Sequence, residues 1–293
     1  MQLPSAEEPD FRLEIYAPED ATRSGYLDEH ADERRINGIS YIVSGSNGKV
    51  VARGAMKCGG KTSCSLPLEL APGAYDYLVV ANGPDISSST GISTALSTPV
   101  PFGTYNNASD GYCMVARGSF KADRHSMSAA CTLYRVVARV CLRSVTNALP
   151  SGLGAFEPEF CRLENAVLGP YTLGGSVSGA PERGRVSERR FSGLTIPVGE
   201  SCRWPSPLCH YGYPDTGLEE PTVLTIAGRV GGILYYYPLR LPVRLESNVT
   251  VSVDLTIRDL GSADPLVPAG KGSIESYITL EKWKEGNTHS SEI

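Results

Sequence analysis

Residues 248–257 read NVTVSVDLTI, and this stretch indicates the fold class. Apolar side chains fall on every second position, with Thr, Ser or Asp between them: Val249, Val251, Val253, Leu255 and Ile257. Successive side chains of a β-strand point to opposite faces of the sheet, so this alternation predicts a strand with one buried and one polar face. Alternation of this kind recurs along the chain while a period of 3.6 residues does not, which predicts an all-β protein.

The segment before this strand, residues 233–243 (ILYYYPLRLPV), also alternates. The short link Glu-Ser-Asn that follows it predicts a hairpin in which the two segments pair. Pro238 and Pro242 fall on the same parity, so both missing N–H donors face one lateral side of the strand. That side is predicted to be a free edge or to meet a bulged partner; the alternative is a strand that breaks at each proline.

The first half of the sequence holds several more predicted strands. Three short ones are residues 10–18, 35–43 and 48–54. An Asn47-Gly48 turn joins the last two, and residues 65–83 give two alternating segments around Pro72-Gly73 that predict another hairpin. Residues 84–111 and the Gly-rich stretch 173–193 carry no strong pattern and are predicted to be surface loops.

A chain of 293 residues exceeds the usual size of one domain, so two domains are expected. The alternation stops near residues 121–130 and resumes in CTLYRVVARVCLRSV, residues 131–145. We therefore predict an N-terminal β-sandwich domain over residues 1–132 and a C-terminal one over residues 133–293.

Composition excludes several classes of protein. Hydrophobic residues make up 41% and charged residues 20%, which is typical of a globular chain and not of a disordered one. The net charge of -5 gives no general attraction to nucleic acid. No apolar run approaches the ~20 residues that span a bilayer. The first residues lack the features of a signal peptide, so the protein is either cytosolic or a mature chain whose leader has been removed.

Cysteine usage favours export. The eight cysteines are Cys58, Cys64, Cys113, Cys131, Cys141, Cys161, Cys202 and Cys209. An even number favours disulfides, with free buried thiols and a metal site as alternatives; zinc sites need tight Cys-x-x-Cys pairs, which are absent. Short loops favour local bridges, so the predicted pairs are Cys58–Cys64 and Cys202–Cys209, followed by Cys113–Cys131 and Cys141–Cys161.

Motifs of catalysis are missing from the sequence. None of the four histidines has the HExxH spacing, and neither GxSxG nor GxxxxGK[ST] occurs. We predict no enzyme activity, no cofactor, no metal and no catalytic residue. Exposed aromatic platforms for a glycan have two candidates, GYPDTG at residues 212–217 and the Tyr run at residues 235–237.

Two ordered sets of motifs resemble a known family. Residues 235–265 combine Tyr237-Pro238, a strand opened by Asn248 and a Leu-Gly-Ser-x-Asp-Pro loop, and the strand that follows ends at Trp283. The N-terminal half contributes ATRSG, RINGISYIVSGSNGKV and LPLELAPGAYDYLVVAN. Together these resemble the fimbrillin and minor fimbrial subunit family of Bacteroidetes type V pili.

The resemblance implies two tandem transthyretin-like β-sandwich domains and export as a lipoprotein. It also implies polymerisation by strand donation, after an Arg-directed protease removes an N-terminal strand. Here that strand would lie within residues 10–23, where Phe11, Leu13 and Ile15 share one parity. Arg12 or Arg23 could be the cleavage site, and Arg23 in a loop is favoured because a loop admits a protease. The alternative is a permanent first strand.

The predicted function is a structural or adhesive subunit of a surface pilus. Eight cysteines favour a minor, tip or anchor-type component. Its partners would be other pilus subunits and a surface receptor, and a lipid anchor supplied by the leader would attach it to the outer membrane. The alternative is a surface carbohydrate-binding lipoprotein with an all-β fold.

Overall fold

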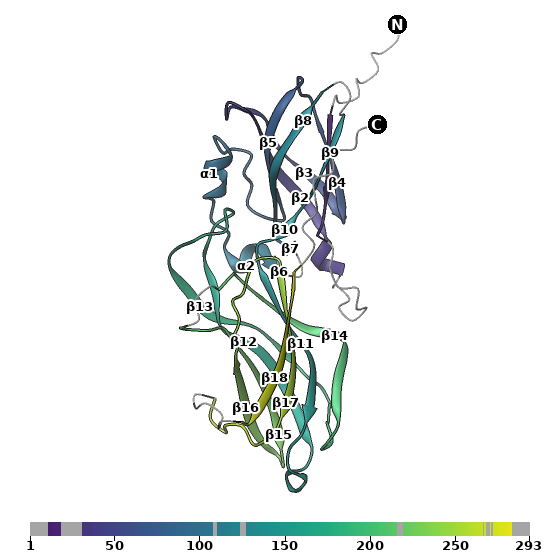
Figure 1. Ribbon diagram of the computed structural model, residues 1–293, viewed down its shortest axis with the longest axis vertical. Helices are drawn as coiled ribbons and strands as arrows, with labels where there is room; N and C mark the ends of the chain where they lie inside the picture. The colour runs from purple at the N-terminus through teal and green to yellow at the C-terminus, as the bar shows by residue number, and fades with distance from the viewer. Residues whose placement is uncertain are drawn as a thin grey trace.

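Two β-sandwiches stand end to end along the long axis of the molecule (Figure 1). This computed structural model describes residues 11–18, 31–107, 110–123, 127–215, 219–265, 267, 270 and 272–282. The elements of the first half are β1 (Phe11–Tyr16), η1 (Ala31–Arg34), β2 (Ile36–Gly45), β3 (Val50–Lys61), β4 (Ser63–Leu68), β5 (Gly73–Ala81), α1 (Ile92–Leu96), α2 (Phe102–Tyr105), β6 (Asn106–Asn107), β7 (Gly111–Tyr112), β8 (Met114–Ala122), β9 (Ser128–Thr132) and β10 (Tyr134–Arg135). The elements of the second half are β11 (Ala138–Asn147), η2 (Ser151–Leu153), β12 (Phe156–Tyr171), β13 (Val177–Arg190), β14 (Ser201–Gly212), β15 (Val223–Val230), β16 (Ile233–Arg240), β17 (Val249–Ile257) and β18 (Ile274–Lys282).

The first sandwich packs a three-stranded sheet, β4-β1-β9, against a five-stranded sheet, β10-β8-β5-β2-β3. Side chains on alternate residues of both sheets meet in one buried cluster, for example Leu13 and Leu66 from the first and Tyr77 and Val79 from the second. Burial of these apolar side chains is the main force that holds the two sheets together.

The second sandwich packs the sheet β14-β11-β17-β18 against the sheet β13-β12-β15-β16. Val251 and Val253 of β17 lie in its core with Phe156 and Tyr237 from the opposite sheet. The strand predicted from residues 248–257 and the all-β fold class are confirmed.

Strand partners were harder to predict than strands. The β2–β3 hairpin is confirmed, and Gly48 in its turn has a φ of 75°, which favours glycine. The other two predicted hairpins are wrong. In the first, β4 pairs with β1, whereas β5 pairs with β2 and β8. In the second, β16 pairs with β15, whereas β17 pairs with β11 and β18. In both places a short link crosses from one sheet of a sandwich to the other.

Two further predictions have definite outcomes. The edge predicted beside Pro238 is free only in part: β16 ends its sheet and pairs with β15 alone among the named strands, but Tyr236 forms an isolated two-bond bridge with Ser262. The loop predicted at residues 173–193 is wrong: β13 occupies most of it and pairs with β12 through a ladder with several register shifts. Those irregularities explain why the segment shows no clean alternation.

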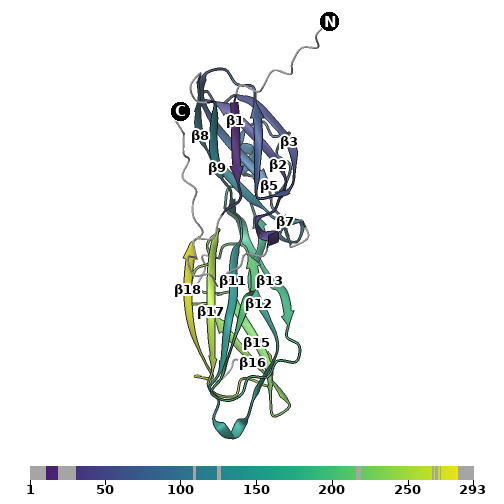
Figure 2. The ribbon, with the colours of Figure 1, turned by 90° about the vertical axis from the view of Figure 1, so that its right-hand side faces the viewer.

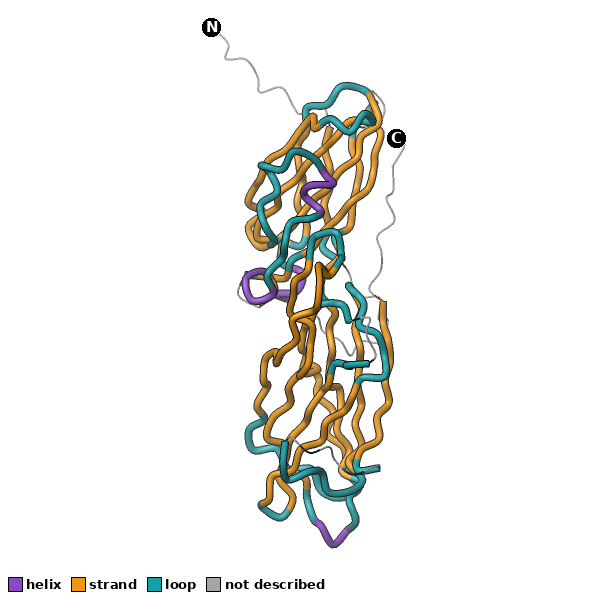
Figure 3. The backbone as a smooth tube through the Cα atoms, turned by 90° about the vertical axis from the view of Figure 1, so that its left-hand side faces the viewer, coloured by secondary structure: helices purple, strands orange, loops and turns teal. Residues whose placement is uncertain are grey.

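A long connection covers the middle of the outer face of the five-stranded sheet. It carries α1 and α2, the two purple helical turns beside and below the first sandwich in Figure 3. Ile86, Ala95 and Val100 from this connection are buried against Ile42 and Val80 of the sheet. Both faces of the sheet are therefore covered along most of its middle strand β5, which explains the near-continuous apolar run of that strand.

The same buried cluster continues into the second half and joins the two sandwiches. Tyr112 from the first half lies 4.2 Å, ring to ring, from Tyr211 of β14. A buried ion pair also crosses here: the Glu33 carboxylate lies 2.5 Å from the Arg139 guanidinium of β11, and these side chains are 0% and 2% exposed. The Tyr211 hydroxyl donates to the same carboxylate. Arg135 donates to the Glu33 carbonyl.

Candidate strand-exchange site

The first strand lies in the middle of a sheet. β1 pairs antiparallel with β4 on one side and parallel with β9 on the other. Figure 2 shows it on the face of the first sandwich, beside β9. Because β4 and β9 have no other partner in this sheet, β1 alone holds them in register.

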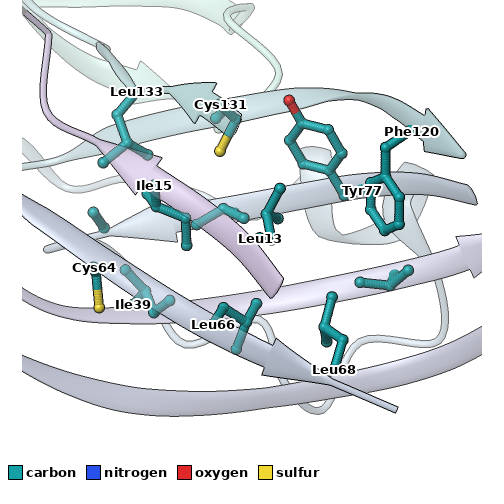
Figure 4. Packing of buried hydrophobic residues seen from close by; sticks show 14 of the residues in the cluster. Leu13, Ile15, Ile39, Cys64, Leu66, Leu68, Tyr77, Phe120, Cys131 and Leu133 are labelled. Carbon is teal, nitrogen blue, oxygen red and sulfur yellow. The ribbon is translucent and has the colours of Figure 1, made fainter. Parts of the chain in front are cut away.

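The inward side of β1 is fully apolar. Phe11, Leu13 and Ile15 are 1%, 0% and 0% exposed, while Arg12 and Tyr16 face outward. Phe11 stacks on Phe120 of β8 with ring centroids 4.6 Å apart. Figure 4 shows Leu13 and Ile15 inside this packing. These three side chains therefore lie on one face of the strand, as their spacing predicted.

Hydrogen bonds extend the ladder between β1 and β9 at both ends of the strand. The Arg12 N–H donates to the Met127 carbonyl at 2.9 Å, and the Leu133 N–H donates to the Tyr16 carbonyl at 2.8 Å. Removing β1 would leave two rows of backbone donors and acceptors, on β4 and β9, flanking an apolar groove. A strand with alternating apolar side chains would pair with both rows of backbone groups and fill the groove between them.

The two candidate cleavage residues fall in different places. Arg12 is part of β1, where its backbone is hydrogen-bonded in the ladders and is poorly suited to protease binding. Arg23 lies outside the described residues.

The disulfides differ from most of the predicted pairs. Cys58–Cys64 is confirmed, and the second bridge joins Cys141 to Cys209. The predicted pairs Cys202–Cys209 and Cys141–Cys161 are therefore wrong. Cys141 and Cys209 are direct register partners on β11 and β14, whereas Cys202 lies near the far end of the extended strand β14, pairing with Val145.

The predicted Cys113–Cys131 pair is also wrong. Both thiols are free and buried, Cys131 in the core of the first sandwich and Cys113 in the cluster at the junction. Closeness in sequence favoured these pairs, but β8 and β9, like β11 and β12, lie in opposite sheets of their sandwich. Cross-strand register was the missing signal, and sequence alone does not supply it.

One buried thiol contacts an imidazole. Cys161 Sγ of β12 and His210 Nε2 of β14 lie 3.0 Å apart, and both side chains are 0% exposed. Burial raises the pKa of the Cys161 thiol to about 12, so the nucleophilic thiolate is scarce at neutral pH. The contact therefore reads as core packing between the two sheets. Among the described residues, no cluster of His, Cys, Asp and Glu could hold a metal ion.

Among the described residues of the two aromatic segments considered for glycan binding, Tyr235 and Tyr236 are half-buried. Tyr213 and Tyr237 are fully buried, and Asp215 forms an ion pair with Arg183 at 2.8 Å. Residues 216–218 lie outside the described part of the chain. In that described part, no helix is long and apolar enough to cross a membrane.

Solved structures share this arrangement over nearly the whole chain. A fimbrilin from Porphyromonas gingivalis is 14% identical with a TM-score of 0.61, covering 96% of this chain and 99% of that one. The chain has the fold of a fimbrial subunit. This fimbrial fold also occurs in a candidate cell adhesion protein from Parabacteroides distasonis (13% identity, TM-score 0.66, covering 94% and 97%). The tip fimbrial protein of Porphyromonas gingivalis, in a C-terminally truncated form, is 19% identical with a TM-score of 0.56, covering 94% and 100%.

Sequence comparisons add nothing to this fold assignment, since no protein-family profile and no curated protein sequence matches the chain. Identities below one fifth with near-complete coverage mean that the fimbrial fold is retained although most side chains differ. The neighbours are structural and adhesion proteins rather than enzymes.

Proposed function

We propose that this protein is a structural or adhesive subunit of a cell-surface pilus, of the minor, tip or anchor type, and that it assembles by β-strand donation. One observation carries the proposal: β1 is the central strand of its sheet and fills an apolar groove with the alternate side chains Phe11, Leu13 and Ile15. The fimbrial and adhesion proteins that share the fold support the same function.

In this proposal, an Arg-specific protease cuts after Arg23 and β1 leaves. A strand from a neighbouring subunit then occupies the groove between β4 and β9, placing apolar side chains where Phe11, Leu13 and Ile15 were. Because a sandwich core tolerates little empty space, the emptied state is unstable, which favours prompt entry of a donor strand.

The proposal includes export to the cell surface. Two disulfides are consistent with an oxidising compartment. Attachment at the outer membrane would come from a lipid carried by the leader, and the partners are the other pilus subunits and a surface receptor. No nucleic acid is expected among them.

Limited digestion tests this proposal. The full chain is treated with an Arg-specific protease and followed by intact mass and size-exclusion chromatography, beside an Arg23→Gln variant as the uncut control. We expect cleavage after Arg23, loss of the N-terminal peptide and the appearance of higher oligomers. A cut chain that stays monomeric, or a native chain that resists the cut, contradicts strand donation by this route.

A further inference from the structure

Two cysteines flank one residue of β1. Ile15 is the register partner of Cys64 on β4 and, on the other side, of Cys131 on β9. Figure 4 shows Ile15 between these two labelled cysteines. Cys64 is bonded to Cys58, whereas Cys131 carries a free thiol. All of these side chains belong to the same buried cluster, so the two cysteines opposite Ile15 point to the same side of the sheet.

β1 keeps the thiol and the disulfide apart. Adjacent strands lie about 4.8 Å apart, so two cysteines on either side of a third strand have Cα atoms roughly 9.6 Å apart. A disulfide requires a Cα–Cα distance of about 4.4–6.8 Å. If β1 leaves and β4 and β9 close over the gap, they become antiparallel neighbours with Cys64 and Cys131 directly opposite.

β1 also suppresses the reactivity of the thiol. Cys131 is 4% exposed, and its burial raises its pKa to about 12. A cysteine exposed to water has a pKa of about 8.5, so at pH 8 removal of the cover would raise the thiolate population about a thousandfold. The thiolate is the form that attacks a disulfide.

We propose that Cys131 and the Cys58–Cys64 bridge form an internal thiol–disulfide exchange site that the first strand holds inactive. The proposal rests on the proposed departure of β1. Cys131 loses its proton to solvent, and its Sγ attacks the Sγ of Cys64. The Cys64–Cys131 bond forms as the Cys58–Cys64 bond breaks, and the electron pair leaves on Cys58, which takes up a proton. One disulfide replaces another, so no oxidant or reductant is required.

The consequence is a covalent closure of an empty groove. A Cys64–Cys131 bond ties β4 to β9 at a distance that leaves no room for a strand between them. A subunit that loses β1 without receiving a donor strand therefore becomes unable to accept one. Donation and closure compete, and prompt donation keeps Ile15's position filled and the thiol covered.

The test displaces β1 without the Arg-specific protease and without a donor, so it stands independently of pilus assembly. In the full chain, a recognition sequence for a specific viral protease is inserted after Pro18, and the cut protein is incubated at pH 8. A second full-length variant, Leu13→Asp with Ile15→Asp, expels the strand without any cut. Free thiols are trapped with iodoacetamide over time, and bridges are mapped by non-reducing peptide mass spectrometry.

We expect the Cys64–Cys131 bridge to replace Cys58–Cys64, with the free thiol moving from Cys131 to Cys58, at a rate at least about a hundredfold above that of the uncut chain. A synthetic peptide with the sequence of residues 10–17 should suppress the exchange. A Cys131→Ser control should keep the Cys58–Cys64 bridge.

Either of two results overturns the proposal. One is a displaced β1 with the Cys58–Cys64 bridge intact and Cys131 alkylated. The other is unselective scrambling that includes Cys202 or Cys161 at comparable yield. Loss of oligomers in the digestion experiment would refute strand donation but would leave this measurement unaffected.

Discussion

The buried ion pair between the two sandwiches predicts a large loss of stability on replacement of Glu33 by Gln. The Arg139 guanidinium is 2% exposed and has the Glu33 carboxylate at 2.5 Å, so the substitution leaves a buried positive charge without that carboxylate. Removing one member of a buried pair costs about 3–5 kcal/mol. In a chain of this size, a loss of 1 kcal/mol in the free energy of unfolding lowers the melting temperature by about 2–4 °C, so Glu33→Gln should lower it by roughly 6–20 °C.

Differential scanning calorimetry of the wild type and three variants measures this. Glu275→Gln is the matched control, because the Arg258–Glu275 pair is 54% and 61% exposed and should contribute at most about 1 kcal/mol. The double variant Glu33→Leu with Arg139→Met removes both charges and should recover most of the lost stability.

A melting temperature of Glu33→Gln within about 2 °C of the wild type, well below the expected drop, would show that the pair does not couple the two sandwiches. A double variant less stable than Glu33→Gln would refute the view that the cost comes from an uncompensated charge.

Four further outcomes are expected from the same structure. Leu13→Ala should lower the free energy of unfolding, measured by chemical denaturation, by about 2–5 kcal/mol because the side chain is fully buried. Glu14→Ala on the outward side should change that free energy by no more than about 0.5 kcal/mol. Cys141→Ser, which opens a bridge of sequence separation 68, should destabilise the chain by about 4 kcal/mol, and an unchanged unfolding midpoint would argue against that bridge. The free energy of unfolding should fall as pH rises from about 8.5 towards 12, because the unfolded chain releases the Cys161 proton while the folded chain retains it. Cys161→Ala should make this dependence of unfolding free energy on pH shallower by about 1.4 kcal/mol per pH unit. An equal slope in the two proteins would contradict the raised pKa of Cys161. Residues 133–293 expressed alone should give a soluble β-rich fragment under oxidising conditions, and aggregation would favour one continuous unit.

Local patterns predicted the strands well. Period-two alternation correctly located β2, β5, β16 and β17, because successive side chains of a strand point to opposite faces of its sheet. It failed at β13, whose ladder with β12 has repeated register shifts, so no constant parity is maintained. It also gave no information on partners, since a link such as residues 245–248 can close a hairpin or cross between sheets.

For the candidate site too, the sequence predicted the strand but not its partners. The apolar side of β1 was readable from Phe11, Leu13 and Ile15, but its place between β4 and β9 was not, because parallel pairing with β9 joins segments far apart in the sequence. The Cys141–Cys209 bridge was missed for the same reason, as its register is a property of the sheet. The Glu33–Arg139 pair carried no sequence signal at all.

Native mass spectrometry of strand incorporation tests strand exchange most directly. The chain carrying the inserted protease site after Pro18 is cut and, with Cys131→Ser to prevent closure, incubated with an isotopically labelled peptide covering residues 10–17. A peptide with Leu13→Asp and Ile15→Asp serves as the control. We predict stoichiometric replacement of the native strand by the labelled peptide and none by the control peptide. Retention of the unlabelled strand by the cut chain, with no labelled peptide incorporated, would contradict an exchangeable first strand.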